Sequence, residues 1–382
     1  MNTPGRIVIV GAGHAGAQTA IALRDHGYSG EVTVIGDETS APYNRPPLSK
    51  AYLKSPEALE VLVRPASFWS EHGVDLRLGS AATAIDRVTR EIRVGTVDPV
   101  PFDSLVLATG ARPRVLPDVR GLPMLRTDSD AQALRTALRP GLQLVLVGAG
   151  YIGLELAATA TQLDAKVTVV EAAPSLLART LSRTTASYLQ EVHEKAGVRF
   201  VLGQAPTAVT HKSVSLPSGE TLHGDLVVIG IGVIPNTELA LDCRLEVGDG
   251  IEVDKFLRTS DPDIYAIGDC ASFPCPVTGR RVRLESVQNG TDQARHVART
   301  LLGQTEAGYA AVPCFWTDQH GRKLMIAGVS SPEDRVEVTG SVAEESFSVR
   351  RYDAADRLTS VESINAVQDH VRARKALAAR AM

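Results

Sequence analysis

The feature that most constrains this chain is a glycine-rich segment that occurs twice, each time directly after a run of β-branched residues. The first copy reads Gly-Ala-Gly-His-Ala-Gly over residues 11–16, and the second reads Gly-Ala-Gly-Tyr-Ile-Gly over residues 148–153. A continuous apolar run fits a strand that is buried on both faces. An alanine-rich stretch and a second apolar run follow each loop, so each copy predicts a strand–helix–strand unit with parallel strands.

Both loops have the glycine spacing of a dinucleotide-binding site. The first glycine permits a tight turn, the second lets the backbone approach a pyrophosphate, and the third lets helix and strand pack closely. Asp37 lies 21 residues after Gly16, and Glu171 lies 18 residues after Gly153, where an acid accepts hydrogen bonds from ribose hydroxyls. The predicted pyrophosphate-loop residues are Gly11, Gly13, Gly16, Gly148, Gly150 and Gly153.

The similarity continues beyond the loops. Residues 103–110 and 225–232 each begin with Asp, continue with an apolar run and end in glycine, at Gly110 and Gly232. A third strand-then-glycine pattern over residues 264–269 predicts that the chain returns to the first module. After residue 311 the pattern alternates, which is typical of antiparallel strands with one wet face, and residues 361–382 are expected to be helical. The expected fold class is therefore α/β, with two Rossmann-like domains and a small C-terminal α+β domain.

Two dinucleotide sites in one chain indicate two dinucleotides. FAD and a nicotinamide cofactor are the natural pair, because each can pass a hydride to the other. Glu171 would face a 2′-phosphate with no adjacent cation, which favours NADH over NADPH, although Arg179 lies nearby. We expect an FAD-binding domain of residues 1–113 and 240–312, an NADH-binding domain of residues 114–239 and a C-terminal interface domain of residues 313–382.

The composition argues against several other classes. The net charge of −4 and the pI of about 6.2 do not suit a nucleic-acid binder. The four cysteines are too sparse for a disulfide framework, no metal-ligand cluster is evident, and no apolar stretch approaches the length of a membrane helix. These features predict a cytoplasmic protein.

Five segments carry a more specific resemblance: residues 44–53 (Asn-Arg-Pro-Pro-Leu-Ser-Lys-Ala-Tyr-Leu), 125–131, 264–270, 285–289 and 315–319. They resemble the FAD-dependent ferredoxin reductases that serve oxygenases, and the related rubredoxin reductases. The resemblance covers nearly the whole chain. It implies a glutathione reductase-like fold and electron transfer from NADH, through FAD, to a ferredoxin that feeds an oxygenase or a cytochrome P450.

The resemblance also implies roles residue by residue. Lys50 resembles the lysine beside flavin N5, where a cation stabilises charge developing on the reduced flavin, and Glu155 resembles its ion-pair partner. Gln288 and His14 depart from the usual pattern, Gln288 at the flavin edge and His14 in the first glycine loop. The positions that the resemblance assigns to FAD are Gly11, Gly13, the Ala15 backbone, Asp37, Lys50, Ala82, Thr109, Gly110, Arg126, Asp269, Val287 and Trp316.

Other chemistries stay open at this stage. A flavin NADH oxidase or a disulfide reductase is one alternative, a rubredoxin reductase is a second, and a signalling flavoprotein like apoptosis-inducing factor is a third. Disulfide reductases carry a redox cysteine after the first strand–helix–strand unit, whereas residues 40–55 contain none. The only candidate pair is Cys270, expected to be buried, and Cys275, expected in a surface loop because prolines flank it.

An external electron acceptor would need a docking surface. Iron–sulfur proteins are usually acidic, so basic residues near the flavin would steer them. We expect Arg281, Arg283 and Arg295 to contribute to such a surface. The pattern leaves open whether the protein is a monomer or a homodimer.

Overall fold

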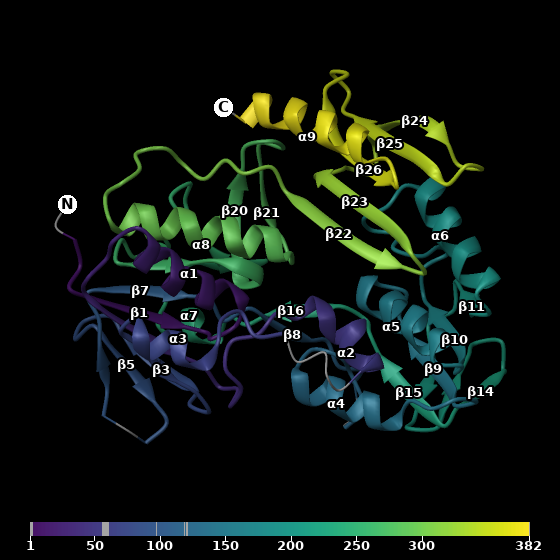
Figure 1. Ribbon diagram of the computed structural model, residues 1–382, viewed down its shortest axis with the longest axis horizontal. Coiled ribbons are helices and arrows are strands. Elements are labelled where there is room, and N and C mark those ends of the chain that lie inside the picture. Colours follow the sequence, from purple (N-terminus) through teal and green to yellow (C-terminus); the bar gives the residue numbers. More distant parts are fainter. Residues whose placement is uncertain (1–2, 56–60, 97, 118, 120, 382) are drawn as a thin grey trace.

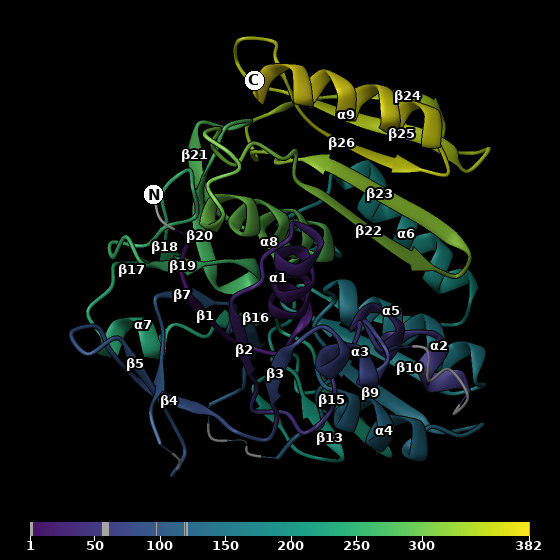
Figure 2. The ribbon, with the colours of Figure 1, turned by 60° about the vertical axis from the view of Figure 1, so that its left-hand side comes forward.

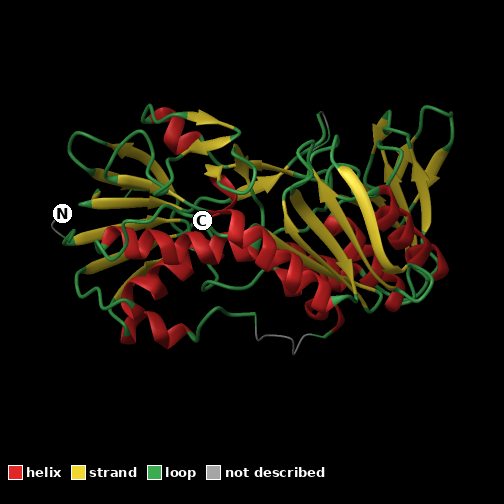
Figure 3. Ribbon diagram, turned by 90° about the horizontal axis from the view of Figure 1, so that it is seen from above, coloured by secondary structure: helices red, strands yellow, loops and turns green. Residues whose placement is uncertain are grey.

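Two parallel sheets form the centres of two modules that lie side by side along the long axis of the molecule (Figures 1 and 3). The computed structural model describes residues 3–55, 61–96, 98–117, 119 and 121–381. The first sheet has five parallel strands in the order β19 (Ile264–Ala266), β7 (Ser104–Leu107), β1 (Arg6–Val10), β2 (Glu31–Ile35) and β3 (Val74–Arg77). The second has four parallel strands in the order β11 (Arg199–Leu202), β10 (Lys166–Glu171), β9 (Gln143–Val147) and β15 (Leu226–Ile229).

The repeated apolar runs form the central strands of both sheets. All but the first residue of β1 and of β9 is buried. Helix α1 (His14–Asp25) links β1 to β2, and α5 (Tyr151–Gln162) links β9 to β10. The prediction of two strand–helix–strand units in an α/β fold is confirmed.

The chain leaves the first sheet after β7 and re-enters it at β19. Between these strands lies the second module, and the two crossings form a short antiparallel ribbon of β8 (Ala111–Pro113) and β16 (Val233–Pro235). Since β19 pairs with β7 in parallel, the third strand-then-glycine pattern completes the first sheet, as the sequence predicts. The exact domain bounds stay a prediction.

Smaller elements surround the two sheets. The helices are α2 (Ala51–Lys54), α3 (Ala66–Glu71), α4 (Asp128–Ala137), α6 (Arg183–Lys195), α7 (Glu238–Asp242) and α8 (Val287–Leu301), with 3₁₀ turns η1 (Pro46–Ser49) and η2 (Gly268–Cys270). The minor strands are β4 (Ala82–Asp86), β5 (Glu91–Val94), β6 (Val100–Pro101), β12 (Ala208–Val209), β13 (Ser213–Ser215), β14 (Thr221–His223), β17 (Val247–Gly248), β18 (Gly250–Glu252), β20 (Ala271–Cys275) and β21 (Arg280–Arg283). None of the helices in the described ranges combines the length and apolar character needed to cross a bilayer.

The C-terminal region is a five-stranded antiparallel sheet with one helix on its outer face (Figure 2). Its order is β22 (Cys314–Gln319), β23 (Arg322–Gly328), β26 (Leu358–Ile364), β25 (Ser346–Tyr352) and β24 (Arg335–Ser341), and α9 (Val367–Ala381) packs on β23 and β26. On the other face, the rings of Phe347 and Tyr188 of α6 meet edge to face at 5.2 Å. The expected α+β character is confirmed.

The helix expected over residues 361–382 begins later than the sequence suggested. Residues 361–364 belong to β26, which pairs with β23 on one side and β25 on the other. Their helical appearance came from the alanines and arginines that follow them. Strand pairing prevails here because both neighbours bond to this segment and all four residues are buried.

A buried carboxylate in β26 fastens this sheet to the second module. Glu362 is 1% exposed and accepts hydrogen bonds from the Nη2 of Arg351 at 2.8 Å and from the backbone N–H and hydroxyl of Ser182. Ser182 is the N-cap of α6, so the carboxylate also lies at the positive end of that helix. The hydrogen bonds between Glu362 and Ser182 therefore join β26 of the C-terminal sheet to α6 of the second module.

We expect Glu362→Gln to loosen this boundary, because it leaves the buried Arg351 without a counter-charge. Removing one partner of a buried ion pair costs about 3–5 kcal/mol. Hydrogen exchange of the β26 amides, followed by mass spectrometry, should accelerate at least about 100-fold through local opening. The exposed Asp356, paired with Arg335, gives the matched control Asp356→Asn, which should leave β26 exchange unchanged. Equal exchange in the two variants would contradict the assignment.

Candidate cofactor and electron-transfer site

The first glycine loop is shaped by close backbone contacts. Gly11 has a φ of +113°, and a Cβ on it would lie 2.1 Å from the carbonyl oxygen of Ala108. A Cβ on Gly16 would lie 1.8 Å from the oxygen of Gly11. A Cβ on Gly13, by contrast, would have no neighbour within 4 Å, so this backbone faces open space.

The second loop repeats this arrangement. Gly148 has a φ of +108°, and its Cβ would lie 2.3 Å from the oxygen of Gly230. A Cβ on Gly153 would lie 2.6 Å from the oxygen of Gly148, whereas the nearest atom to one on Gly150 is 3.8 Å away. In both loops a side chain at the first or third glycine would collide with backbone atoms, whereas the middle glycine leaves room for a ligand.

The open glycines stand at the N-termini of long helices. Gly13 caps α1 and Gly150 caps α5, in both cases without a side-chain cap hydrogen bond and without an acid in the first turn. The first N–H groups of a helix lack intrahelical partners and carry partial positive charge, so they bind phosphates. These residues therefore fit the pyrophosphates of two dinucleotides.

The two predicted ribose acids lie at the ends of β2 and β10. Asp37 is exposed, and its Oδ1 accepts a hydrogen bond from the N–H of Glu38. Glu171 accepts from the N–H of Ala149 at 2.7 Å and from that of Ala173 at 2.8 Å, which holds its carboxylate beside the second loop. Arg179 is exposed, and its Nη2 would lie 3.6 Å from a Cβ placed on Gly232.

Arg126 and Asp269 are brought together although they lie far apart in the sequence. The Nη2 of Arg126 is 2.9 Å from Oδ2 of Asp269, and both side chains are partly buried. Arg126 lies just before α4, while Asp269 lies in η2, after the chain has returned to the first module. A Cβ on Gly110 would lie 3.8 Å from the same guanidinium. Three residues assigned to FAD thus form one cluster.

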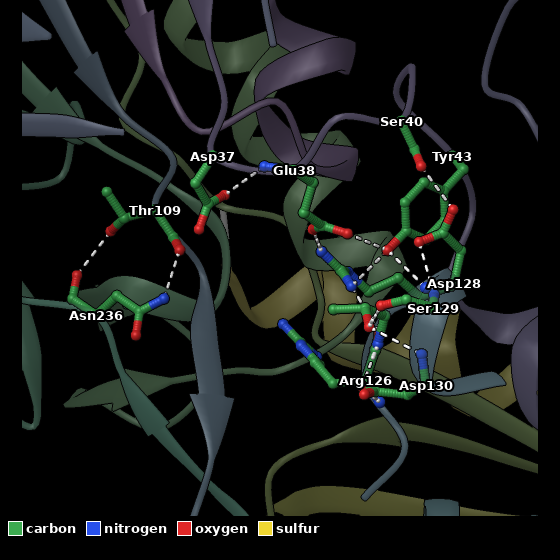
Figure 4. A network of polar contacts seen from close by, with 12 residues as sticks. Asp37, Glu38, Ser40, Tyr43, Thr109, Arg126, Asp128, Ser129, Asp130 and Asn236 are labelled. Carbon is green, nitrogen blue, oxygen red and sulfur yellow. Dashed lines mark hydrogen bonds and ion pairs between the residues drawn. The ribbon is translucent and has the colours of Figure 1, made fainter. Parts of the chain in front are cut away.

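A polar network beside this cluster was not found by sequence reasoning (Figure 4). Glu38 binds Arg45 at 2.6 Å and the Tyr43 hydroxyl at 2.5 Å, and Arg45 also donates to the carbonyl of Arg126. Burial raises the pKa of the Tyr43 hydroxyl above its ordinary value, so it stays protonated and donates to Glu38. The only sequence signal was the position of Arg45 within the segment 44–53. The network holds that segment against the start of α4.

Lys50 and Glu155 form the ion pair that the resemblance implied. The Lys50 Nζ lies 2.6 Å from Oε2 of Glu155, which is 4% exposed although it sits on the helix that follows the second glycine loop. Ser49 donates to the same oxygen at 2.5 Å, and Thr317 donates to Oε1 at 2.6 Å. Sequence reasoning missed Ser49 and Thr317, each of which directly adjoins a residue that it did identify.

Thr109 lies where the two modules join. Its hydroxyl donates to the carbonyl of Asn236 at 2.6 Å, and the Asn236 amide donates back to the Thr109 carbonyl at 2.8 Å (Figure 4). The two hydrogen bonds fix the turn that leads into β8 next to β16, the strand that pairs with β8. Thr109 therefore supports the turn that carries Gly110.

The remaining predicted residues lie around the same region. A Cβ on Gly268 would lie 3.0 Å from the Cβ of Ala15, which places Ala15 beside η2. Ala82 opens β4, just after a turn that bonds back to the loop of Asp37. Val287 opens α8 and Trp316, 39% exposed, lies on β22, and these two elements are in contact.

The three predicted docking arginines differ in their surroundings. Arg281 donates to two backbone carbonyls and faces Glu252 at 3.5 Å. Arg283 is 11% exposed and pairs with Asp249 and Glu285. Arg295 of α8 is exposed, with no ion pair among the described residues. Of the three, Arg295 alone is exposed and also has no internal ion pair among the described residues.

The cysteines of the described chain are all free thiols. Cys270 is buried, as expected, and burial raises its pKa, which disfavours a reactive thiolate. The expectation of a surface loop for Cys275 was wrong, because it ends β20 and is 1% exposed. The prolines beside it are accommodated at that strand's end.

Comparison with known proteins decides the family. The pyridine nucleotide-disulphide oxidoreductase model matches residues 5–294, and the reductase C-terminal model matches residues 314–382. Rhodocoxin reductase of Rhodococcus erythropolis is 43% identical over 97% of this chain and 89% of its own length. Rubredoxin-NAD(+) reductase of Pseudomonas putida is 37% identical over 94% of this chain and 95% of its own length. The chain belongs to the FAD-dependent ferredoxin reductase family.

A solved structure supports the same conclusion at the level of the fold. The covalent putidaredoxin reductase–putidaredoxin complex contains a chain that superposes with a TM-score of 0.95 at 36% identity, over 99% of this chain and 94% of that chain. The resemblance, the fold class and the oxidoreductase class expected from the sequence are thereby confirmed. The family uses FAD and NAD(P)H, which agrees with the fit of two dinucleotides to the two loops.

Proposed function

We propose that this protein oxidises NADH and passes the electrons, through FAD, to a ferredoxin-type iron–sulfur protein that serves an oxygenase or a cytochrome P450. The observation that carries the proposal is the Lys50–Glu155 pair, which joins a segment of the first module to the helix that follows the second glycine loop. When bound, FAD accepts a hydride and releases its electrons one at a time, which suits such a partner. The relatives' names support the same activity.

Each loop has a separate task in this proposal. The N–H groups of α1 around Gly13 bind the FAD pyrophosphate, and those of α5 around Gly150 bind the NADH pyrophosphate. Glu171 accepts hydrogen bonds from the NADH ribose and repels a 2′-phosphate. Gly232 lies in the loop that follows β15, the strand that pairs with β9. The residues proposed for FAD are Gly11, Ala15, Gly16, Asp37, Ala82, Thr109, Gly110, Arg126, Asp269, Val287 and Trp316.

Lys50 supplies the cation at the reacting end of the flavin. Its Nζ is fixed by Glu155 and by the carbonyl of Pro46 at 3.3 Å, and its side chain is 27% exposed. A preoriented ammonium needs no reorganisation when negative charge develops beside it, which lowers the barrier to hydride transfer. Glu155 orients this ammonium.

An anaerobic titration of the purified yellow protein with NADH tests the function. One NADH per FAD should bleach the flavin completely, because the described cysteines are free and buried or half-buried. The reduced protein should then reduce putidaredoxin, used as a probe, far faster than it reduces oxygen or a disulfide. NADPH should bleach the flavin much more slowly, since its 2′-phosphate would meet Glu171. A requirement for two NADH with a thiolate–flavin band would favour a disulfide reductase, and a preference for rubredoxin would favour a rubredoxin reductase.

Lys50→Met should slow flavin reduction by NADH about 100-fold, the loss typical when one group stabilising transition-state charge is removed. Stopped-flow absorbance under anaerobic conditions measures the rate constant directly. Lys54→Met is the matched control, since Lys54 lies one helical turn further on and bonds Gln162. A wild-type rate in Lys50→Met would contradict the role of Lys50.

For the partner we propose an acidic ferredoxin that docks near α8, with Arg295 as one contact. The support is the exposure of Arg295 and the complex in which a structural relative binds putidaredoxin. Arg281 and Arg283 were also expected to dock, and their internal partners make them weaker candidates.

Arg295→Glu should raise the KM for putidaredoxin several-fold at low salt, with a smaller effect at high salt, because the steering is electrostatic. NADH-dependent ferricyanide reduction should stay at the wild-type rate. Arg244→Glu makes the same charge change at an exposed position beside α7 and should leave both activities unaltered. If the KM rises equally in both variants, the change in the protein's net charge explains the effect, which would count against docking at Arg295.

A further inference from the structure

A chain of hydrogen bonds runs from Glu155 into the C-terminal sheet and back into the second module. Thr317 donates to Oε1 of Glu155 at 2.6 Å, and the Gln319 amide nitrogen lies 3.2 Å from the Thr317 oxygen. The Gln319 amide oxygen lies 2.8 Å from Nε2 of His193 on α6. Nδ1 of His193 in turn lies 3.1 Å from Nε2 of His320. The flavin-side ion pair is thus connected to two histidines that its chemistry does not otherwise use.

The chemistry of the groups allows only one direction for this chain. A carboxylate oxygen can only accept, so Thr317 gives its single hydroxyl proton to Glu155. The Thr317 oxygen must then accept from the nitrogen of Gln319, which turns the amide oxygen towards His193. That oxygen also only accepts, so His193 carries its proton on Nε2 and accepts at Nδ1 from His320. Every donor in the chain points towards Glu155.

Burial prevents water from replacing Thr317, Gln319 or His193 in this chain. His193 is 0% exposed, Gln319 and Thr317 are 1% exposed, and the ring of Phe200 packs edge-on against His193. Burial also lowers the pKa of His193 to about 4, so its ring is neutral near pH 7 and can donate at one nitrogen while it accepts at the other. A buried polar group that loses its partner costs free energy, which keeps the order of donors fixed.

We infer that His193 and Gln319 are positioning residues for flavin reduction. They keep the Thr317 hydroxyl oriented as a donor to Glu155, and so fix the geometry of the Lys50–Glu155 ion pair. Without the Gln319 amide, the Thr317 hydroxyl is free to turn away and Oε1 of Glu155 loses its donor. The inference rests on the proposed roles of Lys50 and Glu155. It adds that a second-module helix and the C-terminal sheet jointly set the geometry of that pair.

The tautomer of His193 tests the direction of the chain without any turnover. We would label the holoprotein with ¹⁵N-histidine, record its imidazole nitrogens by NMR near pH 7, and assign His193 from the signal that disappears in His193→Phe. If that variant does not fold, His320→Gln identifies the resonance by shifting it. A proton on Nε2 and an unprotonated Nδ1 is the expected result. The other tautomer, or a doubly protonated ring, would overturn the inference.

Gln319→Glu tests the function of the chain, because a carboxylate there cannot donate and would draw the Thr317 hydroxyl away from Glu155. We expect about a tenfold fall in the rate constant for flavin reduction by NADH, as a lost hydrogen bond to a charged group predicts. The midpoint potential of the bound flavin should also fall, since Glu155 then presents more uncompensated negative charge. Thr317→Val should show the same losses and Thr317→Ser should restore them.

The controls separate this inference from the proposed function. Thr339→Val removes a hydroxyl from β24 of the same sheet and should change neither the rate nor the potential. Combining Gln319→Glu with Thr317→Val should be no worse than Thr317→Val alone, because both act through one hydrogen bond. Wild-type rates and potentials, or additive losses, would overturn the inference. If Lys50→Met still slows reduction in that case, the proposed function stands, whereas a wild-type rate in Lys50→Met removes the basis of both.

Discussion

The interaction on which the site depends is the burial of the Glu155 carboxylate. A charged group with so little exposure is tolerated only when its oxygens are paired and hydrogen-bonded. Glu155 achieves this with three donors from two other parts of the chain: Ser49 and Lys50 from the segment before α2, and Thr317 from the C-terminal sheet. The side chain thus satisfies its charge only when the first module, the second module and the C-terminal sheet are all in place.

The same three parts are held together elsewhere by contacts of the same kind. Arg126 and Asp269 pair across the two modules, Thr109 and Asn236 exchange hydrogen bonds at their junction, and Glu362 binds the N-terminus of α6 from the C-terminal sheet. These contacts are polar and directional, and they add to an apolar core in which the segment before α2, the second module and the C-terminal sheet pack together. The polar contacts and this shared core set the orientation of the parts, which is what hydride transfer between two bound dinucleotides requires.

Sequence reasoning succeeded where the signal is local and repeated. The apolar runs, the glycine spacing and the acids at fixed offsets predicted both parallel sheets, both loops and the return strand, because neighbouring residues determine each of these features. It was wrong over residues 361–364, where pairing with β23 and β25 decided the structure, and at Cys275, which ends a strand that forms a hairpin with β21. Ser49 and Thr317 were missed for a related reason: Ser49 lies 106 residues from Glu155 and Thr317 lies 162 residues away.

The sequence by itself therefore determined the two nucleotide-binding units and, through resemblance, the family and the residues to consider around a flavin. Only the tertiary structure decided which of those residues meet. The Lys50–Glu155 contact, the neutralised Arg283 and the open Arg295 follow from how the modules pack, which no local pattern encodes. The chain from Glu155 to His320 also depends on it, since three of its four links join side chains that become neighbours only when α5, α6 and the C-terminal sheet have packed together.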